Sequence, residues 1–143
     1  YKKRGEYDAA CKEMLEIAKK KAKKLDINAD FYVGNAEKLK FNKEKFDYVV
    51  DSLGLCSFPN PVRALKEMKR VCKKNGKILL LEHGISNNKF FSKFQHWREN
   101  RTYNGFRCAL TRNHEELVRK AGLEIKKSER HLFGNFYFII ANS

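Results

Sequence analysis

The run from Phe46 to Val50 constrains the fold most, because it is apolar, aromatic and β-branched and then turns abruptly polar. This composition predicts a strand that is buried on both faces of a parallel sheet. Asp51, Ser52 and Gly54 follow the run directly. Ligands of open parallel sheets bind beyond the carboxyl ends of the strands. We therefore expect functional residues at the point where this strand ends.

A helix and a second buried strand follow along the chain. Asn60 is a suitable N-cap, Pro61 suits the first helical position, and Asn75-Gly76 is expected to end the helix. The apolar residues 77–81 then predict a strand that stops at Glu82-His83-Gly84. Two parallel strands joined by a crossover helix form a right-handed βαβ unit. The two strands should therefore end at a common rim.

The segments that flank this unit complete an α/β pattern. Apolar periodicity predicts a lysine-flanked helix from Cys11 to about Leu25, and a short strand is expected over residues 29–33. After the second buried strand, the aromatic-rich residues 85–106 are less regular and are partly helical.

The C-terminal part predicts a short helix and a pair of strands. Thr111 or Asn113 should cap the helix. Residues 123–132 and 135–142 have strand composition and are separated by Phe133-Gly134. So short a connection requires an antiparallel hairpin.

Length and charge bound the function classes. The chain has 143 residues, which suffices for one domain spanning residues 1–143. No apolar run approaches the roughly 20 residues of a membrane-spanning helix. The net charge of +14 is compatible with binding to nucleic acid or an anionic membrane surface, but the lysines are spread along the chain, which favours solvated faces.

The four cysteines, Cys11, Cys56, Cys72 and Cys108, lie far apart in the sequence. None belongs to a C-x-x-C pair, so no metal site is predicted. We expect reduced thiols in a reducing compartment, cytoplasmic or organelle-associated.

The order of the elements resembles the C-terminal two-thirds of a class I S-adenosylmethionine-dependent methyltransferase. Residues 34–39, Gly-Asn-Ala-Glu-Lys-Leu, resemble the G-D-A-E-x-L loop of the ubiquinone/menaquinone-biosynthesis-like group, methyltransferase type 11. Residues 46–50 resemble its F-D-x-V strand, and residues 60–71 resemble its N-P-x-x-x-L-x-E-x-x-R-V helix. Three tripeptides are more specifically similar to the thiol methyltransferase-like branch: Leu55-Cys56-Ser57, Leu81-Glu82-His83 and Leu110-Thr111-Arg112.

The resemblance implies a Rossmann-like fold with a mostly parallel sheet, a C-terminal antiparallel hairpin and an incomplete N-terminal part, because the glycine-rich first loop is absent from the sequence. It also implies S-adenosylmethionine as cofactor. Asp8 is the nearest match for the acidic residue that holds the ribose, while Asn35, Ala36 and Glu37 would lie along the adenine. The rest of the implied cofactor site is Asp51, Ser52 and Leu53.

Two residues are predicted to take part in the chemistry. His83 follows a buried strand and titrates near neutral pH, so it can remove a proton from an acceptor, although a lone histidine at a strand end is often structural. Asp51 is a base or an orienting group, or it caps backbone amides at the turn. The residues expected on the substrate side are Cys56, Phe58, Phe94 and Trp97.

The resulting hypothesis is a methyltransferase that acts on a small or lipid-like acceptor through a thiol, hydroxyl or activated carbon. Basic and aromatic residues between positions 89 and 107 suit an amphipathic acceptor and peripheral membrane contact. The alternatives are an RNA- or protein-directed methyltransferase, suggested by charge alone, and a non-catalytic domain of the same fold.

Overall fold

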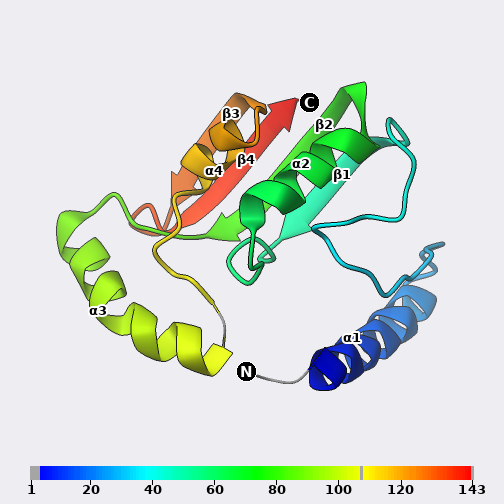
Figure 1. The fold of residues 1–143 in the computed structure, drawn as a ribbon, viewed down its shortest axis with the longest axis horizontal. Helices are drawn as coiled ribbons and strands as arrows, with labels where there is room; N and C mark the ends of the chain where they lie inside the picture. The colour runs from blue at the N-terminus through cyan, green and yellow to red at the C-terminus, as the bar shows by residue number, and fades with distance from the viewer. Residues whose placement is uncertain (1–3, 107, 143) are drawn as a thin grey trace. The chain divides into compact units, whose positions relative to one another are not determined.

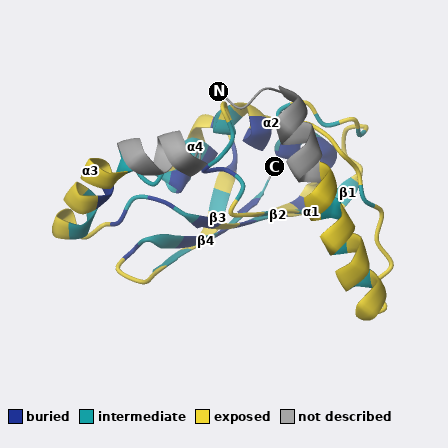
Figure 2. Ribbon diagram, turned by 90° about the horizontal axis from the view of Figure 1, so that it is seen from below, coloured by how far each residue is buried: buried dark blue, intermediate teal, exposed yellow. Residues whose placement is uncertain are grey.

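A computed structural model describes the backbone of residues 4–106 and 108–142 and the side chains of residues 12–99 and 108–142. The chain divides into two compact units, residues 1–35 and 36–143. The first unit contains helix α1 (Arg4–Lys24), whose described side chains are mostly exposed (Figure 2). The single domain expected over residues 1–143 stays a prediction.

The second unit carries a four-stranded sheet and three helices (Figure 1). The strand order is β1-β2-β4-β3, in which β1 and β2 are parallel and the other two pairings are antiparallel. This is the expected combination of a parallel βαβ unit with a C-terminal antiparallel hairpin. The elements of this unit are β1 (Phe46–Ser52), α2 (Pro61–Val71), β2 (Cys72–His83), α3 (Lys89–Phe106), α4 (His114–Lys120), β3 (Glu124–His131) and β4 (Phe136–Asn142).

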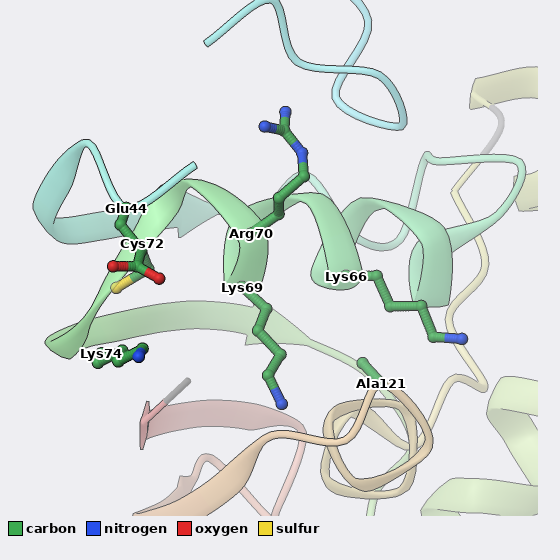
Figure 3. A pocket seen from close by; sticks show the side chains of 7 residues that line it. All are labelled: Glu44, Lys66, Lys69, Arg70, Cys72, Lys74 and Ala121. Atoms are coloured by element: carbon green, nitrogen blue, oxygen red, sulfur yellow. The ribbon is translucent and has the colours of Figure 1, made fainter. Parts of the chain in front are cut away.

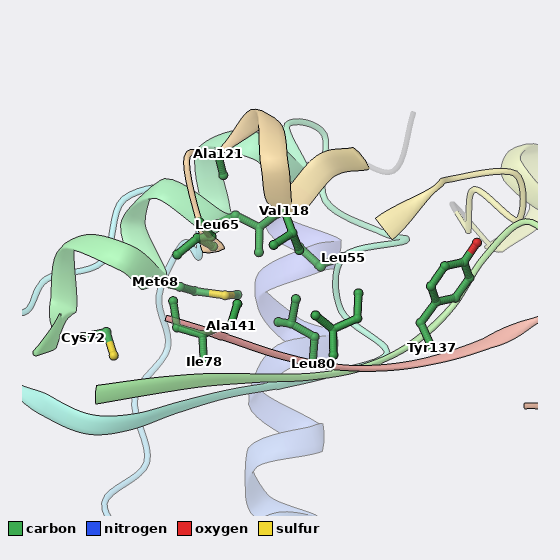
Figure 4. Close-up of a cluster of buried hydrophobic side chains, with 12 residues drawn as sticks. Leu55, Leu65, Met68, Cys72, Ile78, Leu80, Val118, Ala121, Tyr137 and Ala141 are labelled. Atoms are coloured by element: carbon green, nitrogen blue, oxygen red, sulfur yellow. The ribbon is translucent and has the colours of Figure 1, made fainter. Parts of the chain in front are cut away.

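The core lies between the sheet and two helices on one of its faces (Figure 4). Helix α2 packs on β1 and β2, and α4 packs on β3 and β4. Burial of these aliphatic side chains supplies the main stabilisation, about 1.5–3 kcal/mol for each large one. The buried cluster consists of Leu55, Leu65, Met68, Cys72, Ile78, Leu80, Val118, Ala121, Leu123, Tyr137, Ile139 and Ala141.

The helices begin where side chains cap them. The Asn60 side chain accepts a hydrogen bond from the backbone N–H of Arg63 at 3.0 Å, and Pro61 stands at the first helical position of α2. Asn113, rather than Thr111, caps α4. These caps satisfy N–H groups that have no partner within the helix.

Three local predictions are wrong. Residues 29–33 form no strand and join none of the sheet pairings described. Strand β1 is not buried on both faces, because α2 packs on one face while Tyr48 and Val50 are 62% and 65% exposed on the other. Helix α2 ends at Val71, and Asn75-Gly76 lies inside the irregular start of β2.

Among the residues that the structure describes, no helix combines the length and apolar character needed to cross a bilayer.

Gly76 is required for a close approach of two chain segments. A Cβ atom at this position would lie 2.6 Å from the Cys72 sulfur and 2.7 Å from the Asp47 carbonyl oxygen. We predict that Gly76→Ala lowers the free energy of unfolding by about 1–3 kcal/mol, the usual cost of overpacking, in urea denaturation. Gly34→Ala is the control, because a Cβ there meets nothing within 4 Å. Equal stability of the two variants would contradict this interpretation.

Candidate active site at the rim of two parallel strands

The carboxyl ends of β1 and β2 form one rim. Ser52 pairs with Leu81 in the parallel register, and the Leu53 N–H donates to the Leu81 carbonyl oxygen at 2.9 Å. Asp51 and His83 therefore lie at the same edge of the sheet, as predicted from the ends of the two apolar runs. The geometry shows where these side chains lie, while their roles stay predictions.

A tight turn leaves β1 at this rim. Leu53 has a φ of +57°, an uncommon conformation for a residue with a side chain. Gly54 follows, and a Cβ there would lie 2.3 Å from an Asp51 carboxyl oxygen. The turn closes with a 2.9 Å hydrogen bond from the Ser57 N–H to the Gly54 carbonyl oxygen. Glycine at position 54 is what allows the turn to fold against Asp51.

The fully buried Glu82 carboxyl group fixes this turn from the neighbouring strand. Its Oε1 accepts hydrogen bonds from the N–H groups of Gly54 at 3.0 Å and Leu55 at 3.3 Å. Burial, and then the adjacent Asp51, raises the pKa of Glu82 to about 8. Burial also raises the pKa of Asp51. Oδ2 of Asp51 and Oε2 of Glu82 are buried, and no N–H or O–H group of the described residues donates to them. The site therefore favours one proton shared between the two carboxyl groups.

His83 stands beside two thiol groups. Its Nε2 lies 3.1 Å from the Cys108 sulfur, and the nitrogen and sulfur atoms of His83, Cys56 and Cys108 all lie within 4.8 Å of one another. Burial lowers the pKa of His83, so the imidazole is neutral at neutral pH and able to accept a proton. Burial and the neighbouring Cys56 thiol raise the pKa of Cys108 to about 12.

Three polar residues at the rim carried no predicted role. His114 is fully buried, and its Nε2 contacts the His83 carbonyl oxygen at 2.9 Å. Burial lowers the pKa of His114 to about 4, which marks it as a neutral structural group. Gln95 of α3 accepts from the Ser86 N–H at 2.8 Å and donates to the Gly84 carbonyl oxygen at 2.8 Å. Cys108 is the third, and no sequence signal distinguished it from the other cysteines.

The predicted adenine loop is only partly connected to the rim. The Glu37 carboxylate accepts a 2.7 Å hydrogen bond from the Asn60 N–H and so holds the start of α2. Ala36 is half-buried beside it in the sequence. Asn35 belongs to the first unit, and Asp8 falls within α1 but its side chain lies outside the described residues. Contact of these residues with a cofactor stays a prediction.

The predicted substrate residues divide into two places. Cys56 is buried at the rim, and Phe58 packs against the core next to Gly54. Phe94 and Trp97 lie on α3 with ring centroids 5.7 Å apart and are 45% and 67% exposed. They belong to an aromatic row that continues through Phe91 to Phe133, so their role on the substrate side stays a prediction.

A hollow of about 550 Å³ lies at the opposite end of the sheet (Figure 3). Cys72, at the amino end of β2, lines it together with Lys66, Lys69 and Arg70 of α2. Two of these cations are already engaged, because Lys69 donates to the Gly122 carbonyl oxygen and Arg70 pairs with Glu67. This hollow is separate from the rim and holds none of the predicted site residues.

The carboxyl pair predicts a pH dependence of stability. Folding raises the pKa of Glu82 from 4.5 to about 8, so the folded state binds more protons than the unfolded state between these values, and stability falls as pH rises through this window. Glu82→Gln keeps the acceptor for the turn and stays neutral. We predict that the thermal midpoint of this variant changes less between pH 5 and 8 than that of the unchanged protein. Glu124→Gln, at an exposed carboxylate, is the control, and equal slopes for Glu82→Gln and the unchanged protein would contradict the shared proton.

The sequence is similar to known methyltransferases. The family described as "Methyltransferase domain" matches residues 10–141. Methyltransferase OMS1, mitochondrial, of Saccharomyces cerevisiae is 32% identical over 125 residues, covering 78% of this chain and 26% of that protein. The ubiquinone/menaquinone biosynthesis C-methyltransferase UbiE of Rickettsia prowazekii is 44% identical over 72 residues, covering 49% of this chain and 29% of that protein. The chain thus spans about a quarter to a third of the length of these relatives.

Solved structures agree on the fold. The PH0226 protein of Pyrococcus horikoshii has a TM-score of 0.68 at 20% identity, covering 91% of this chain and 66% of that chain. A SAM-dependent methyltransferase of Methanosarcina mazei has a TM-score of 0.59 at 25% identity, covering 81% and 68%. The predicted fold class, family and S-adenosylmethionine cofactor are confirmed at this level, while the thiol methyltransferase-like branch stays a prediction. The chain belongs to the methyltransferase domain family.

Proposed function

We propose that the protein transfers the methyl group of S-adenosylmethionine to a small or lipid-like acceptor. The observation that carries this proposal is the shared rim, because Asp51 and Ser52 of β1 and His83 of β2 lie at the same edge of the sheet. In open α/β sheets this is the place where ligands bind. Family membership supports the reaction class, and the relatives named as quinone-biosynthesis C-methyltransferases support a quinone-like acceptor with an activated ring carbon.

The rim fits part of the cofactor. The Asp51 carboxyl group lies at the end of β1 beside that of Glu82, with which it shares a proton, and Ser52, the next residue of β1, is exposed. We infer that Asp51, Ser52 and the backbone of Leu53 hold the cofactor along the rim, with Ala36 and Glu37 as further contacts. S-adenosylmethionine supplies an electrophilic methyl group on a sulfonium sulfur.

The chain's own residues position the acceptor and handle its proton. The neutral imidazole of His83 accepts the proton that the acceptor loses, because burial keeps its pKa below the usual value. Cys56 and Phe58 close the rim on the apolar side. A thiol, a hydroxyl and an activated carbon all lose a proton on methylation, so His83 serves each of these acceptors.

The surface of α3 suits an amphipathic acceptor. Phe90, Phe94 and Trp97 are exposed, and Lys89 and Lys93 lie on the same helix. Exposed aromatic rings beside lysines are typical of segments that lie at a membrane surface. Peripheral membrane contact, a nucleic-acid substrate and a cytoplasmic or organelle-associated location all stay predictions.

Asp51 is tested by cofactor binding. We predict that Asp51→Asn in the full-length protein weakens S-adenosylmethionine binding by about tenfold, equivalent to about 1.4 kcal/mol, because an acceptor at the rim is partly replaced by a donor. Isothermal titration calorimetry measures this change. Asp47→Asn, at an exposed carboxylate on the same strand, is the control. Unchanged affinity in Asp51→Asn would remove Asp51 from the cofactor site.

His83 is tested by methyl transfer from radiolabelled S-adenosylmethionine to a demethylated quinone and, in parallel, to an alkyl thiol. We predict that His83→Ala lowers kcat by about 100-fold or more, the usual contribution of a general base, while the affinity for S-adenosylmethionine is preserved. The acid limb of kcat/KM should lie below pH 6.5, because burial lowers the pKa of His83.

The exposed His131 provides the matched control, since His131→Ala removes an imidazole outside the rim. Full activity of His83→Ala at every pH would make His83 a structural residue. Activity with neither acceptor, despite cofactor binding, would contradict the proposed acceptor class.

A further inference from the structure

We propose that Cys56, His83 and Cys108 form a binding site for a thiophilic divalent cation, Zn²⁺. The sequence spacing predicted no metal site, because the three residues come from distant segments. The structure brings one ligand atom of each within 4.8 Å of the others. Two thiolates and an imidazole are a ligand set that binds zinc in proteins, and three protein ligands leave a fourth position open.

Hydrogen bonds that do not involve the thiols hold the three segments together. The Ala109 N–H donates to the Cys56 carbonyl oxygen at 3.1 Å, which fixes the segment of Cys108 beside the turn after β1. The Arg112 guanidinium donates to the Leu55 carbonyl oxygen. The Ile85 N–H donates to the Arg112 carbonyl oxygen at 3.0 Å, directly after the end of β2. The ligand atoms are therefore gathered before any cation binds.

The spacing of the atoms is close to what a cation needs. Around a tetrahedral Zn²⁺, ligand atoms lie roughly 3.5–3.8 Å apart, given metal–sulfur bonds of about 2.3 Å and metal–nitrogen bonds of about 2.0 Å. Nε2 of His83 and the Cys108 sulfur are 3.1 Å apart, and every pair in the cluster is within 4.8 Å. Small side-chain rotations are enough to reach the bound geometry.

The polar atoms of the cluster also lack other partners. Nδ1 of His83 is buried with no hydrogen-bond partner among the described residues. Besides its contact with Cys108, the Cys56 sulfur makes weak contacts of 3.5 Å to the Leu53 carbonyl oxygen and the Ser57 hydroxyl. When Zn²⁺ binds, each thiol releases one proton to solvent, and two thiolates balance the charge of the cation. The loaded site carries no net charge, which suits its partly buried position.

The site shares His83 with the proposed function but does not depend on methyl transfer. A cation held by these three ligands would have a fourth position open to the acceptor. There it would lower the pKa of a bound thiol or hydroxyl and replace His83 as the group that favours deprotonation. This last step rests on the proposed function, whereas metal binding can be measured without a substrate.

Binding is tested on the metal-free full-length protein with Cys11→Ser throughout. Titration with Co²⁺ should give one ion per chain and a thiolate-to-cobalt charge-transfer band, which Zn²⁺ then abolishes. We expect Cys108→Ser and Cys56→Ser each to weaken Zn²⁺ affinity, measured against a chromophoric chelator, by more than about tenfold. Cys72→Ala is the control, because Cys72 is as buried as Cys56 but lies at the amino end of β2.

A measurement on the unsubstituted protein keeps the test decisive if a variant fails to fold. Zn²⁺ should slow alkylation of Cys56 and Cys108 but leave Cys72 unchanged, as read by mass spectrometry of the labelled peptides. Zinc affinity that survives both serine substitutions, or protection of Cys72 alone, would overturn the proposal. Formation of a Cys56–Cys108 disulfide that Zn²⁺ does not prevent would also overturn it and would indicate a redox pair instead.

Discussion

The rim depends on one buried carboxyl group. The parallel pairing of β1 with β2 ends near Ser52 and Leu81, and beyond that point the backbone of the turn needs another acceptor. Glu82 supplies it by accepting from Gly54 and Leu55. A buried, unpaired carboxylate would be costly, so Glu82 remains protonated beside Asp51 at neutral pH. The same contact that shapes the turn therefore sets the charge of the site.

Local signals in the sequence were sufficient for much of the fold. The Asn60 and Asn113 side chains each accept a hydrogen bond from a backbone N–H three residues later and so cap their helices. An interaction over so short a stretch can be predicted from the local sequence. The strand predicted over residues 29–33 is absent from the structure. Strand composition shows that a segment could fit into a sheet, but a strand forms only where a neighbouring strand is available to pair with it. The prediction that Asn75-Gly76 ends helix α2 was wrong. A glycine that allows a close approach to Asp47, 29 positions earlier in the chain, has the same sequence signature as a glycine at a helix end.

The position of the candidate site residues at one edge of the sheet was predictable only where they follow strand ends. Asp51 and His83 could be found because an apolar run stops at each of them, and parallel strands bring such points together. Cys108 could not be found in this way, since its contact with His83 spans 25 residues and lies outside any periodic element. The burial of Glu82 was also hidden, because a charged residue at a strand end is ordinarily solvated.

The Gln95 amide has a consequence for how the protein tolerates change. Its oxygen accepts from Ser86, and its nitrogen contacts carbonyl oxygens of Gly84 and Leu110 and the side chain of Asn135. A single planar group of α3 thus contacts three other stretches of chain, and no other natural side chain has the same length with both donors and acceptor at its tip. Substitution of Gln95 would therefore disturb the junction between α3, the end of β2 and the hairpin, although Gln95 is not one of the predicted site residues.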